Sequence, residues 1–225
     1  MASSAMTLSV VATRASLARV SVGTSGWSYP SWKPGFYPAG TDSKQFLQYY
    51  AQHFSTVELN TTGYRLPAEE QFRKWRDQTP TGFTFAPKLA GNRPRMLAEF
   101  ASRVGQLDDR LGPIRVQLIG HRDEGMIELI LGSLDPESQL AFDLEDESWN
   151  GIEPRLAAAG AVRVNDLETE APFRYVRLRE PPYTDDELNG WAERLRGVEV
   201  PAFVYMRHED EPTAPSYAKR LVELL

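Results

Sequence analysis

Two observations on the sequence predict an α/β fold with eight parallel strands. Short β-branched runs alternate with helical patterns, and the runs begin at intervals of about 20 to 30 residues. That interval is the length of one strand-plus-helix unit, and eight such units imply a closed (β/α)8 TIM barrel. The runs cover residues 19–25, 56–60, 83–88, 114–119, 140–145, 161–166, 175–179 and 202–207. The barrel is slightly shortened, because 225 residues fall below the ~250 that are typical and no room for a helix is left between Asp166 and Tyr175. We therefore expect the helix after the sixth strand to be reduced or missing.

Apolar residues spaced by three and four predict the helices that connect these strands. The stripes are Leu97, Phe100, Val104, Leu107 and Leu111; Phe46, Tyr50 and Phe54; Leu188, Trp191 and Leu195; and Tyr217, Leu221 and Leu224. Segments 68–78 and 123–134 complete the helical set. The first stripe along the chain is entered through Thr41-Asp42-Ser43, residue types that cap helix N-termini.

A doubly wound open sheet is the alternative fold. It calls for a glycine fingerprint directly after the first strand. The stretch GTSGWS, residues 23–28, does not match G-x-G-x-x-G, so the barrel is favoured.

Length and composition indicate one folded domain, residues 19–225, preceded by a flexible tail, residues 1–18. The net charge of −6 and the lack of a basic stripe predict no nucleic-acid partner. No apolar run approaches the ~18 residues of a membrane span, so no membrane association is expected. The absence of cysteine excludes disulfides and thiolate chemistry and fits a cytoplasmic protein. The sequence gives no indication of an oligomeric state.

The strand ends carry charged and polar residues that the two-residue period turns toward the barrel interior. Active sites of such barrels lie at the carboxyl ends of the strands. The inward residues are Glu58 and Asn60, Lys88, Arg115 and Gln117, Asp143 and Glu145, Arg177 and Arg179, and Tyr205 and Arg207. Because an unpaired buried charge is costly, these groups are expected to pair with one another, hold ions, or meet solvent and ligand.

Two kinds of chemistry fit this set. Glu58, Asp143 and Glu145, with Lys88, are candidates for acid–base catalysis, in which two carboxylates could flank a glycosidic bond. The same carboxylates with Asp166 could instead bind Mg²⁺ or Mn²⁺, which prefer oxygen ligands. Zinc is not expected, since cysteine is absent and the histidines lie far apart in sequence. A non-functional alternative is that these charged groups only pair with one another, in an ionic network at the mouth of the barrel.

Aromatic residues and arginines near the same ends indicate the ligand class. Aromatic rings that could stack on a sugar ring or a base are Trp27, Tyr29, Trp32, Tyr64 and Trp149. The guanidinium groups of Arg177, Arg179 and Arg207 follow the seventh and eighth strands, where barrels commonly bind phosphate. We therefore expect a small anionic or phosphorylated, sugar-like ligand, with Ser25 and Gln117 among the contacts.

Long stretches of the chain resemble the domain-of-unknown-function family 72 (YecE-like) from about Val20 onward. They are GTSGWSYPSWKPGFYP, FLQYYAQHFSTVELNTTGYRLP, LGPIRVQLI, YVRLREPPY and VYMRHED. The resemblance implies a TIM barrel and no known reaction. Positions that match the family pattern are Gly23, Thr24, Ser25, Gly26, Trp27, Tyr29, Glu58, Asn60, Tyr64, Lys88, Gln117, Arg177 and Tyr183.

Three strand ends depart from the pattern of that family. Its Glu-x-Arg-His before a tryptophan is here Asp143, Leu144, Glu145 and Asp146. Its His-Gly after the seventh strand is Arg179-Glu180, and its Asn-rich eighth end is Arg207, His208 and Glu209. These departures indicate a changed substrate or lost activity. The predicted function is an enzyme, a hydrolase or an isomerase, that acts on the anionic sugar-like ligand by carboxylate and lysine acid–base chemistry. The alternatives are a non-catalytic binding protein on a degenerate enzyme scaffold and, more weakly, a nucleic-acid processing protein.

Overall fold

The computed structural model describes residues 20–89, 93–208 and 212–225. The predicted tail, residues 1–18, and Glu209 lie outside these ranges. The strands are β1 Val20–Thr24, β2 Thr56–Leu59, β3 Thr84–Pro87, β4 Ile114–Leu118, β5 Leu140–Leu144, β6 Val162–Arg163, β7 Arg174–Leu178 and β8 Ala202–Met206. The α-helices are α1 Phe46–Tyr50, α2 Glu69–Asp77, α3 Pro94–Val104, α4 Glu124–Ser133, α5 Glu153–Ala158, α6 Asp185–Arg196 and α7 Thr213–Leu224. All eight predicted strands are present, and they alternate with helices as expected.

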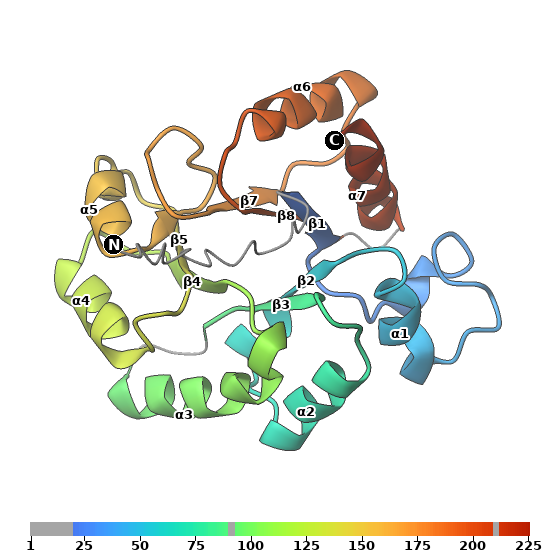
Figure 1. Ribbon diagram of the computed structural model, residues 1–225, viewed down its shortest axis with the longest axis horizontal. Coiled ribbons are helices and arrows are strands. Elements are labelled where there is room, and N and C mark those ends of the chain that lie inside the picture. Colours follow the sequence, from blue (N-terminus) through green and yellow to red (C-terminus); the bar gives the residue numbers. More distant parts are fainter. Residues whose placement is uncertain (1–19, 90–92, 209–211) are drawn as a thin grey trace, which may run out of the picture.

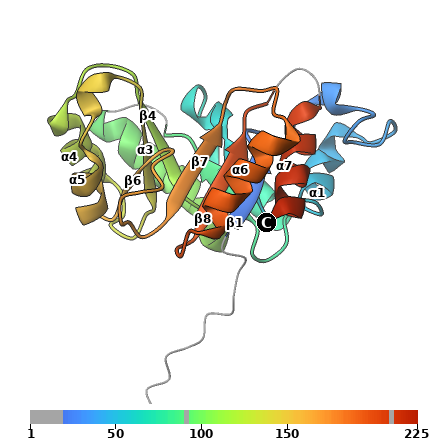
Figure 2. The same cartoon turned by 90° about the horizontal axis from the view of Figure 1, so that it is seen from above.

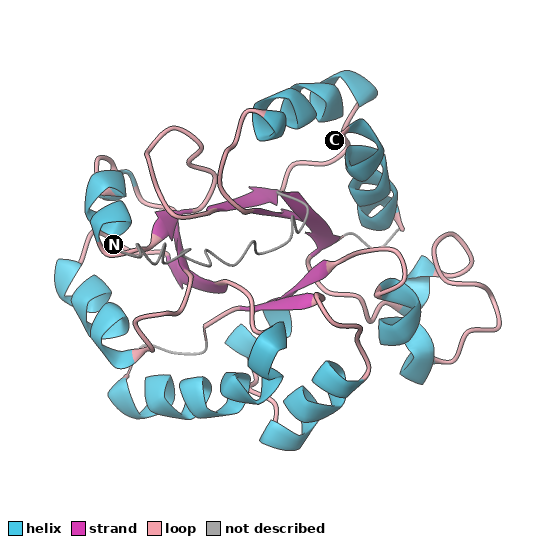
Figure 3. Ribbon diagram, viewed as in Figure 1, coloured by secondary structure: helices cyan, strands magenta, loops and turns pink. Residues whose placement is uncertain are grey.

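The strands form three parallel sheets, ordered β1-β8-β7, β2-β3 and β4-β5-β6. They lie around the centre of the molecule, and the helices cover their outer side (Figures 1 and 3). Figure 2 shows β7, β8 and β1 side by side and running in one direction. Single bridges link neighbouring sheets, Ser25 with Glu58 and Lys88 with Arg115. The described residues form three separate sheets and no single closed one, so the structure does not show the closed barrel that the sequence predicted. The short strands β2, β3 and β6 offer few backbone groups for a continuous ladder.

Side chains of the sheets separate into two apolar layers, as the two-residue period predicts. Outward residues such as Val57, Phe85 and Phe142 pack against the helices in the main core. Inward residues form a second cluster, Ala86, Ala141, Val162, Val164, Phe173, Tyr175, Phe203 and Tyr205. The interior is therefore filled with side chains below the strand ends, and the polar groups lie above this plug.

The segments between the strands agree with the predicted helices in part. Asp42 and Gln45 form the predicted cap, but α1 ends at Tyr50, so Phe54 is buried beyond the helix. Between β6 and β7 the chain forms a loop without a helix, as the spacing predicted (Figure 1).

Gly23 lets β1 approach β2 closely. A Cβ atom at this position would lie 2.1 Å from the Thr56 carbonyl oxygen and 2.9 Å from the Tyr50 hydroxyl. That hydroxyl accepts the Thr24 amide hydrogen at 2.8 Å and donates to the Thr56 carbonyl at 3.0 Å. Glycine here thus permits the hydrogen bonds through which Tyr50 joins the two strands.

We predict that Gly23→Ala lowers the free energy of unfolding by about 3 kcal/mol, because neither the backbone nor the buried tyrosine can move away. Gly132→Ala, in α4, is the matched control: nothing lies within 4 Å of the added methyl group. It should raise stability by about 0.5–1 kcal/mol through better helix propensity. Urea unfolding of both variants measures the difference, and equal effects would contradict the proposed close approach.

Candidate functional site

Glu58, at the inner side of β2, is fully buried and surrounded by hydrogen-bond donors. The hydroxyl group of Ser25 donates to Oε1, and the Tyr175 hydroxyl donates to Oε2 at 2.7 Å. Arg177 donates through Nη2 to Oε1 at 2.9 Å, and Arg115 Nη1 lies 3.8 Å from the same oxygen. The Nε atom of Arg177 is 2.9 Å from Oε2, an ion-pair contact without hydrogen-bond direction. Both carboxylate oxygens are therefore occupied.

Asp143, on the inner side of β5, is the second buried carboxylate. Arg115 binds its Oδ2 with two nitrogens, Nε at 2.8 Å and Nη2 at 2.6 Å. Arg179 Nη2 pairs with Oδ1, and Arg177 Nη1 lies 3.7 Å from Oδ2. Arg115 and Arg177 thus each contact both carboxylates, and the guanidinium groups lie between them.

We call these five residues, Glu58, Asp143, Arg115, Arg177 and Arg179, the ionic network. It holds three positive and two negative charges, and side chains from β2, β4, β5 and β7 contribute to it, with Arg179 directly after β7. Four members are almost fully buried, whereas the Arg179 side chain is 31% exposed. The surplus positive charge therefore faces the solvent at the carboxyl ends of the strands.

The surroundings keep both carboxylates ionised. Burial by itself would raise the pKa of Glu58, but the charges of Arg177 and Arg115 and the hydrogen bonds of Ser25 and Tyr175 bring it below its usual value. For Asp143, burial is likewise outweighed by Arg179 and Arg115, and its pKa is also lowered. Burial and the charge of Glu58 raise the pKa of Tyr175 well above its usual value. Tyr175 therefore stays protonated and donates to Glu58.

Lys88 lies outside the ionic network. Its stem runs along Gly63, and its Nζ atom lies 4.7 Å from the centre of the Tyr64 ring, a cation–π contact. Tyr64 itself is 80% exposed. Within the described residues no carboxylate is within 4.0 Å of this ammonium group. The predicted grouping of Lys88 with the acidic residues is therefore not formed, because the side chain turns toward the turn after β2.

Three predicted site residues, Gln117, Glu145 and Tyr205, lie at other depths than the network. Gln117 and Glu145 bind each other through an amide–carboxylate hydrogen bond of 2.5 Å at the exposed rim. Tyr205 is buried, and its hydroxyl bonds the Thr56 hydroxyl at 2.8 Å, one inward layer below Glu58. Glu145 is thus too far out, and Tyr205 too deep, to act directly beside Glu58.

Arg207 and Asp166 also lie apart from the buried carboxylates. Arg207 is exposed, and among the described residues its Nη1 donates to the Arg179 carbonyl oxygen at 3.5 Å. Asp166 accepts hydrogen bonds from the amides of Glu168 and Thr169 in the loop after β6. Since Glu58 and Asp143 are bound by arginines, the predicted Mg²⁺ or Mn²⁺ ligands do not converge. No group of three or more His, Asp or Glu residues suited to a metal ion occurs in the described chain.

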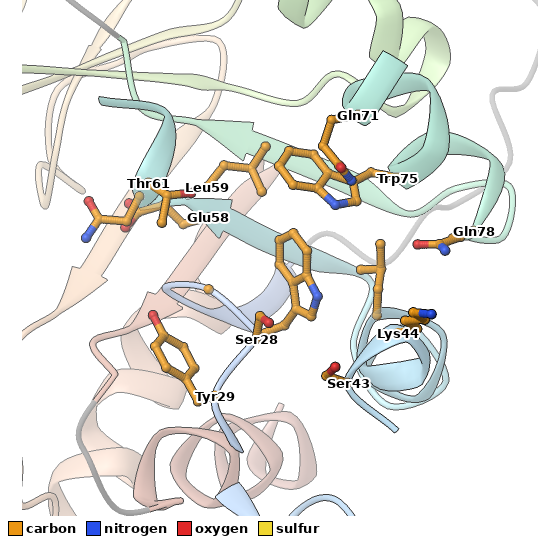
Figure 4. A pocket seen from close by; sticks show the side chains of 14 residues that line it. Ser28, Tyr29, Ser43, Lys44, Glu58, Leu59, Thr61, Gln71, Trp75 and Gln78 are labelled. Carbon is orange, nitrogen blue, oxygen red and sulfur yellow. The ribbon is translucent and has the colours of Figure 1, made fainter. Parts of the chain in front are cut away.

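A pocket of about 420 Å³ lies beside the network between α1 and α2 (Figure 4). It contains the predicted ligand residues Trp27, Tyr29 and Asn60. Asn60 Oδ1 accepts a hydrogen bond from Arg115 Nη1 at 3.3 Å, so the pocket and the network touch. The Tyr29 hydroxyl donates to the Ser25 carbonyl oxygen, and burial followed by the charge of Glu58 raises its pKa to about 12.

Some site residues were missed by sequence reasoning. The period that turned Arg177 inward also turns Tyr175 inward, and Arg115 was seen as inward but not assigned a role. Both therefore had a usable signal. Gln71 and Trp75, which line the pocket, lie on α2, and no strand-based pattern could have selected them.

The class of protein defined by these observations is an α/β protein of parallel sheets with a buried ionic site at the carboxyl ends of its strands. The sequence pattern of the family "Protein of unknown function DUF72" matches residues 21–225. The chain therefore belongs to the DUF72 family, as its motifs predicted.

Curated relatives agree with this assignment, and a solved structure shares the fold. The UPF0759 protein YecE of Escherichia coli (strain K12) is 35% identical over 106 residues, which cover 43% of this chain and 36% of that protein. YunF of Bacillus subtilis (strain 168) is 34% identical over 30% of this chain and 23% of its own length. The matched parts thus span about a third or less of these relatives. A crystal structure of a DUF72 family protein from Enterococcus faecalis V583 superposes with a TM-score of 0.72 at 17% identity, covering 82% of this chain and 94% of that one. At this identity the likeness shows the fold alone.

No helix among the described residues is long and apolar enough to span a membrane.

We predict that Glu58→Gln lowers the free energy of unfolding by about 3 to 5 kcal/mol, because it leaves buried guanidinium charge without its counter-charge. The control is Glu70→Gln, which removes an ion pair with Lys74 on the surface of α2. That change should leave stability unaltered within error. Urea unfolding at pH 7 measures both, and a Glu58→Gln protein as stable as the wild type would contradict the network.

We also predict that stability falls in acid more steeply for the wild type than for Glu58→Gln. The pKa values of Glu58 and Asp143 are lower in the folded than in the unfolded chain, where they are about 4.3 and 3.9. Their contribution is complete above about pH 5 and is lost as the pH falls through the folded values. Urea midpoints measured between pH 7 and pH 2.5 test this, and identical slopes would refute it.

Proposed function

We propose that this protein binds a small anionic, sugar-like molecule, for which a phosphorylated sugar is the model, at the carboxyl ends of its strands. The single observation that carries the proposal is the surplus guanidinium of Arg179. Its side chain is 31% exposed, and its buried Nε has no hydrogen-bond partner among the described residues. A partly exposed guanidinium group in a cluster with surplus positive charge is suited to phosphate or carboxylate oxygens.

A second cavity supports this ligand class. It has a volume of about 410 Å³ and lies between the end of β7 and the start of α6. Arg177, Arg179, Asn165 and Trp191 contribute to its walls. Glu180 and Glu187 also line it, but Glu187 accepts the Thr184 amide hydrogen at 2.7 Å as part of the helix cap. The Asn165 amide is bound to the Arg177 backbone on both sides, so the cavity offers guanidinium donors and an aromatic ring, which suit a sugar-like anion.

Catalysis, as a hydrolase or an isomerase, is the second candidate function. It is favoured by Glu58, a carboxylate that stays ionised and accepts a hydrogen bond from the Ser25 hydroxyl. Such a group is a candidate general base. The guanidinium groups between Glu58 and Asp143 occupy the position of a bond that two carboxylates would flank. Acid–base chemistry that includes Lys88 requires its ammonium group to leave the Tyr64 ring.

The finer description of the fold is also a proposal. We propose that the three sheets are arcs of one shortened (β/α)8 TIM barrel. The strand order and the bridges between Ser25 and Glu58 and between Lys88 and Arg115 support it. We further propose a cytoplasmic location, which fits a chain without cysteine.

We predict that glucose 6-phosphate and inorganic phosphate raise the midpoint of thermal unfolding of the wild-type protein in a concentration-dependent way, because binding stabilises the folded state. Arg179→Ala should abolish the shift. Arg76→Ala is the matched control, since that side chain is also 31% exposed and pairs with a carboxylate, Asp77. It should keep the full shift.

The same samples separate the two candidate functions. Turnover of the sugar phosphate, followed by ³¹P and proton NMR, that occurs in the wild type and stops in Glu58→Gln would favour an enzyme. Binding without turnover would favour the non-catalytic alternative. No thermal shift with either probe, or an equal shift in Arg179→Ala, would overturn the anion site.

A further inference from the structure

The pocket between α1 and α2 has two aromatic walls set at right angles. The Trp27 and Trp75 rings lie 5.2 Å apart with an interplanar angle of 88°. Leu47 and Leu59 add aliphatic surface to the same cavity. In Figure 4 the Trp75 side chain lies across the cavity from Ser43 and Lys44. The ring contacts with Phe72 at 5.3 Å and Phe85 at 6.3 Å hold Trp75 in place.

Five neutral polar side chains of this pocket make no hydrogen bond to another described residue. The side chains of Gln71, Gln78, Ser28, Ser43 and Thr61 line the cavity. Within the described residues, none of them makes a side-chain hydrogen bond. The indole N–H groups of Trp27 and Trp75 likewise donate to no acceptor in this part of the chain. Several donors and acceptors are thus available around two aromatic faces.

The two charged residues of the pocket lining do not require a charged ligand. Glu58 reaches the cavity, but its carboxylate is bound by Ser25, Tyr175 and Arg177. Lys44 is exposed on the rim. The remaining lining groups are amides, hydroxyls and apolar carbons, which suit a ligand with many hydroxyl groups and no required charge.

We propose that this pocket binds a neutral monosaccharide ring, a ligand class that the anion site does not provide for. A pyranose presents a C–H face to one aromatic ring and hydroxyl groups at its edge to amides. A flat nucleobase would gain from two parallel rings, which the perpendicular arrangement of Trp27 and Trp75 does not offer. The volume of about 420 Å³ lies in the range of small-molecule sites. The proposal does not depend on the anion site, because the second cavity is lined by other residues.

The test is a titration of the wild-type protein with methyl glycosides of glucose, galactose, mannose and xylose, followed by indole N–H resonances. The chain has five tryptophans. At least one glycoside should shift the signals of Trp27 and Trp75 and leave those of Trp32, Trp149 and Trp191 unchanged. The Trp149 indole is an internal reference, since it donates to the Gly120 carbonyl at 2.9 Å.

The double variant Gln71→Ala/Gln78→Ala should weaken the binding of that glycoside by about tenfold or more, because each amide supplies hydrogen bonds to the sugar. Neither side-chain amide forms a hydrogen bond with a described residue, so the variant should fold normally. Gln52→Ala, an exposed glutamine after α1 that does not line the cavity, should bind like the wild type. Arg179→Ala should also bind the glycoside normally, which distinguishes this pocket from the anion site. Unmoved indole signals with all four glycosides, or equal affinity in the double variant, would overturn the proposal.

Discussion

Two carboxylates buried above a plug of apolar side chains are the constraint on which the rest of this structure depends. A buried charge is tolerated only when an opposite charge and hydrogen bonds replace its water. Glu58 and Asp143 meet this condition only if β2, β4, β5 and β7 present their inward residues at one level. Ser25, which follows β1, adds a further strand end through its hydroxyl group. The network therefore fixes how strand ends from all three sheets meet, although no continuous ladder connects those sheets.

The excess of guanidinium groups over carboxylates gives this arrangement its chemical character. Had the charges been equal, the network would be complete in itself. With Arg179 in addition, one guanidinium group faces solvent while Arg115 and Arg177 are held inside. One of the two cavities is lined by Glu58 of the network and by Asn60, which accepts a hydrogen bond from Arg115, and the other is lined by Arg177 and Arg179. This geometry fits recognition of an anion and of a sugar ring better than it fits a pair of free catalytic carboxylates.

The sequence could predict the charged residues of the site because a strand has a strict period of two. That period placed Glu58, Asp143 and Arg177 on one face. The cost of an unpaired buried charge then predicted, as one alternative, that these groups pair with one another in an ionic network. The period could not give depth, and so Tyr205 proved to lie one layer below and Glu145 at the exposed rim. Nor could it give the direction of a long flexible side chain such as Lys88, which is set by its contact with Tyr64.

Closure of the sheet and the pocket on α2 were beyond sequence patterns for different reasons. Closure depends on hydrogen bonds between strand edges, and β6 spans only Val162–Arg163. The pocket depends on how α2 packs next to the turn after β1, a contact between segments far apart in sequence. The missing helix after β6, in contrast, followed directly from the short spacing before Tyr175.

The most direct measurement of the central claim is a pH titration of the side-chain carboxyl carbons of Glu58 and Asp143 by ¹³C NMR. Spectra of Glu58→Gln and Asp143→Asn would assign the two signals. Both carboxyl signals should titrate at a lower pH than the ordinary pKa values of about 4.3 for glutamate and about 3.9 for aspartate. A carboxyl signal of either residue that titrates at pH 5 or above would show that the arginines do not hold the site ionised, and the account would be contradicted.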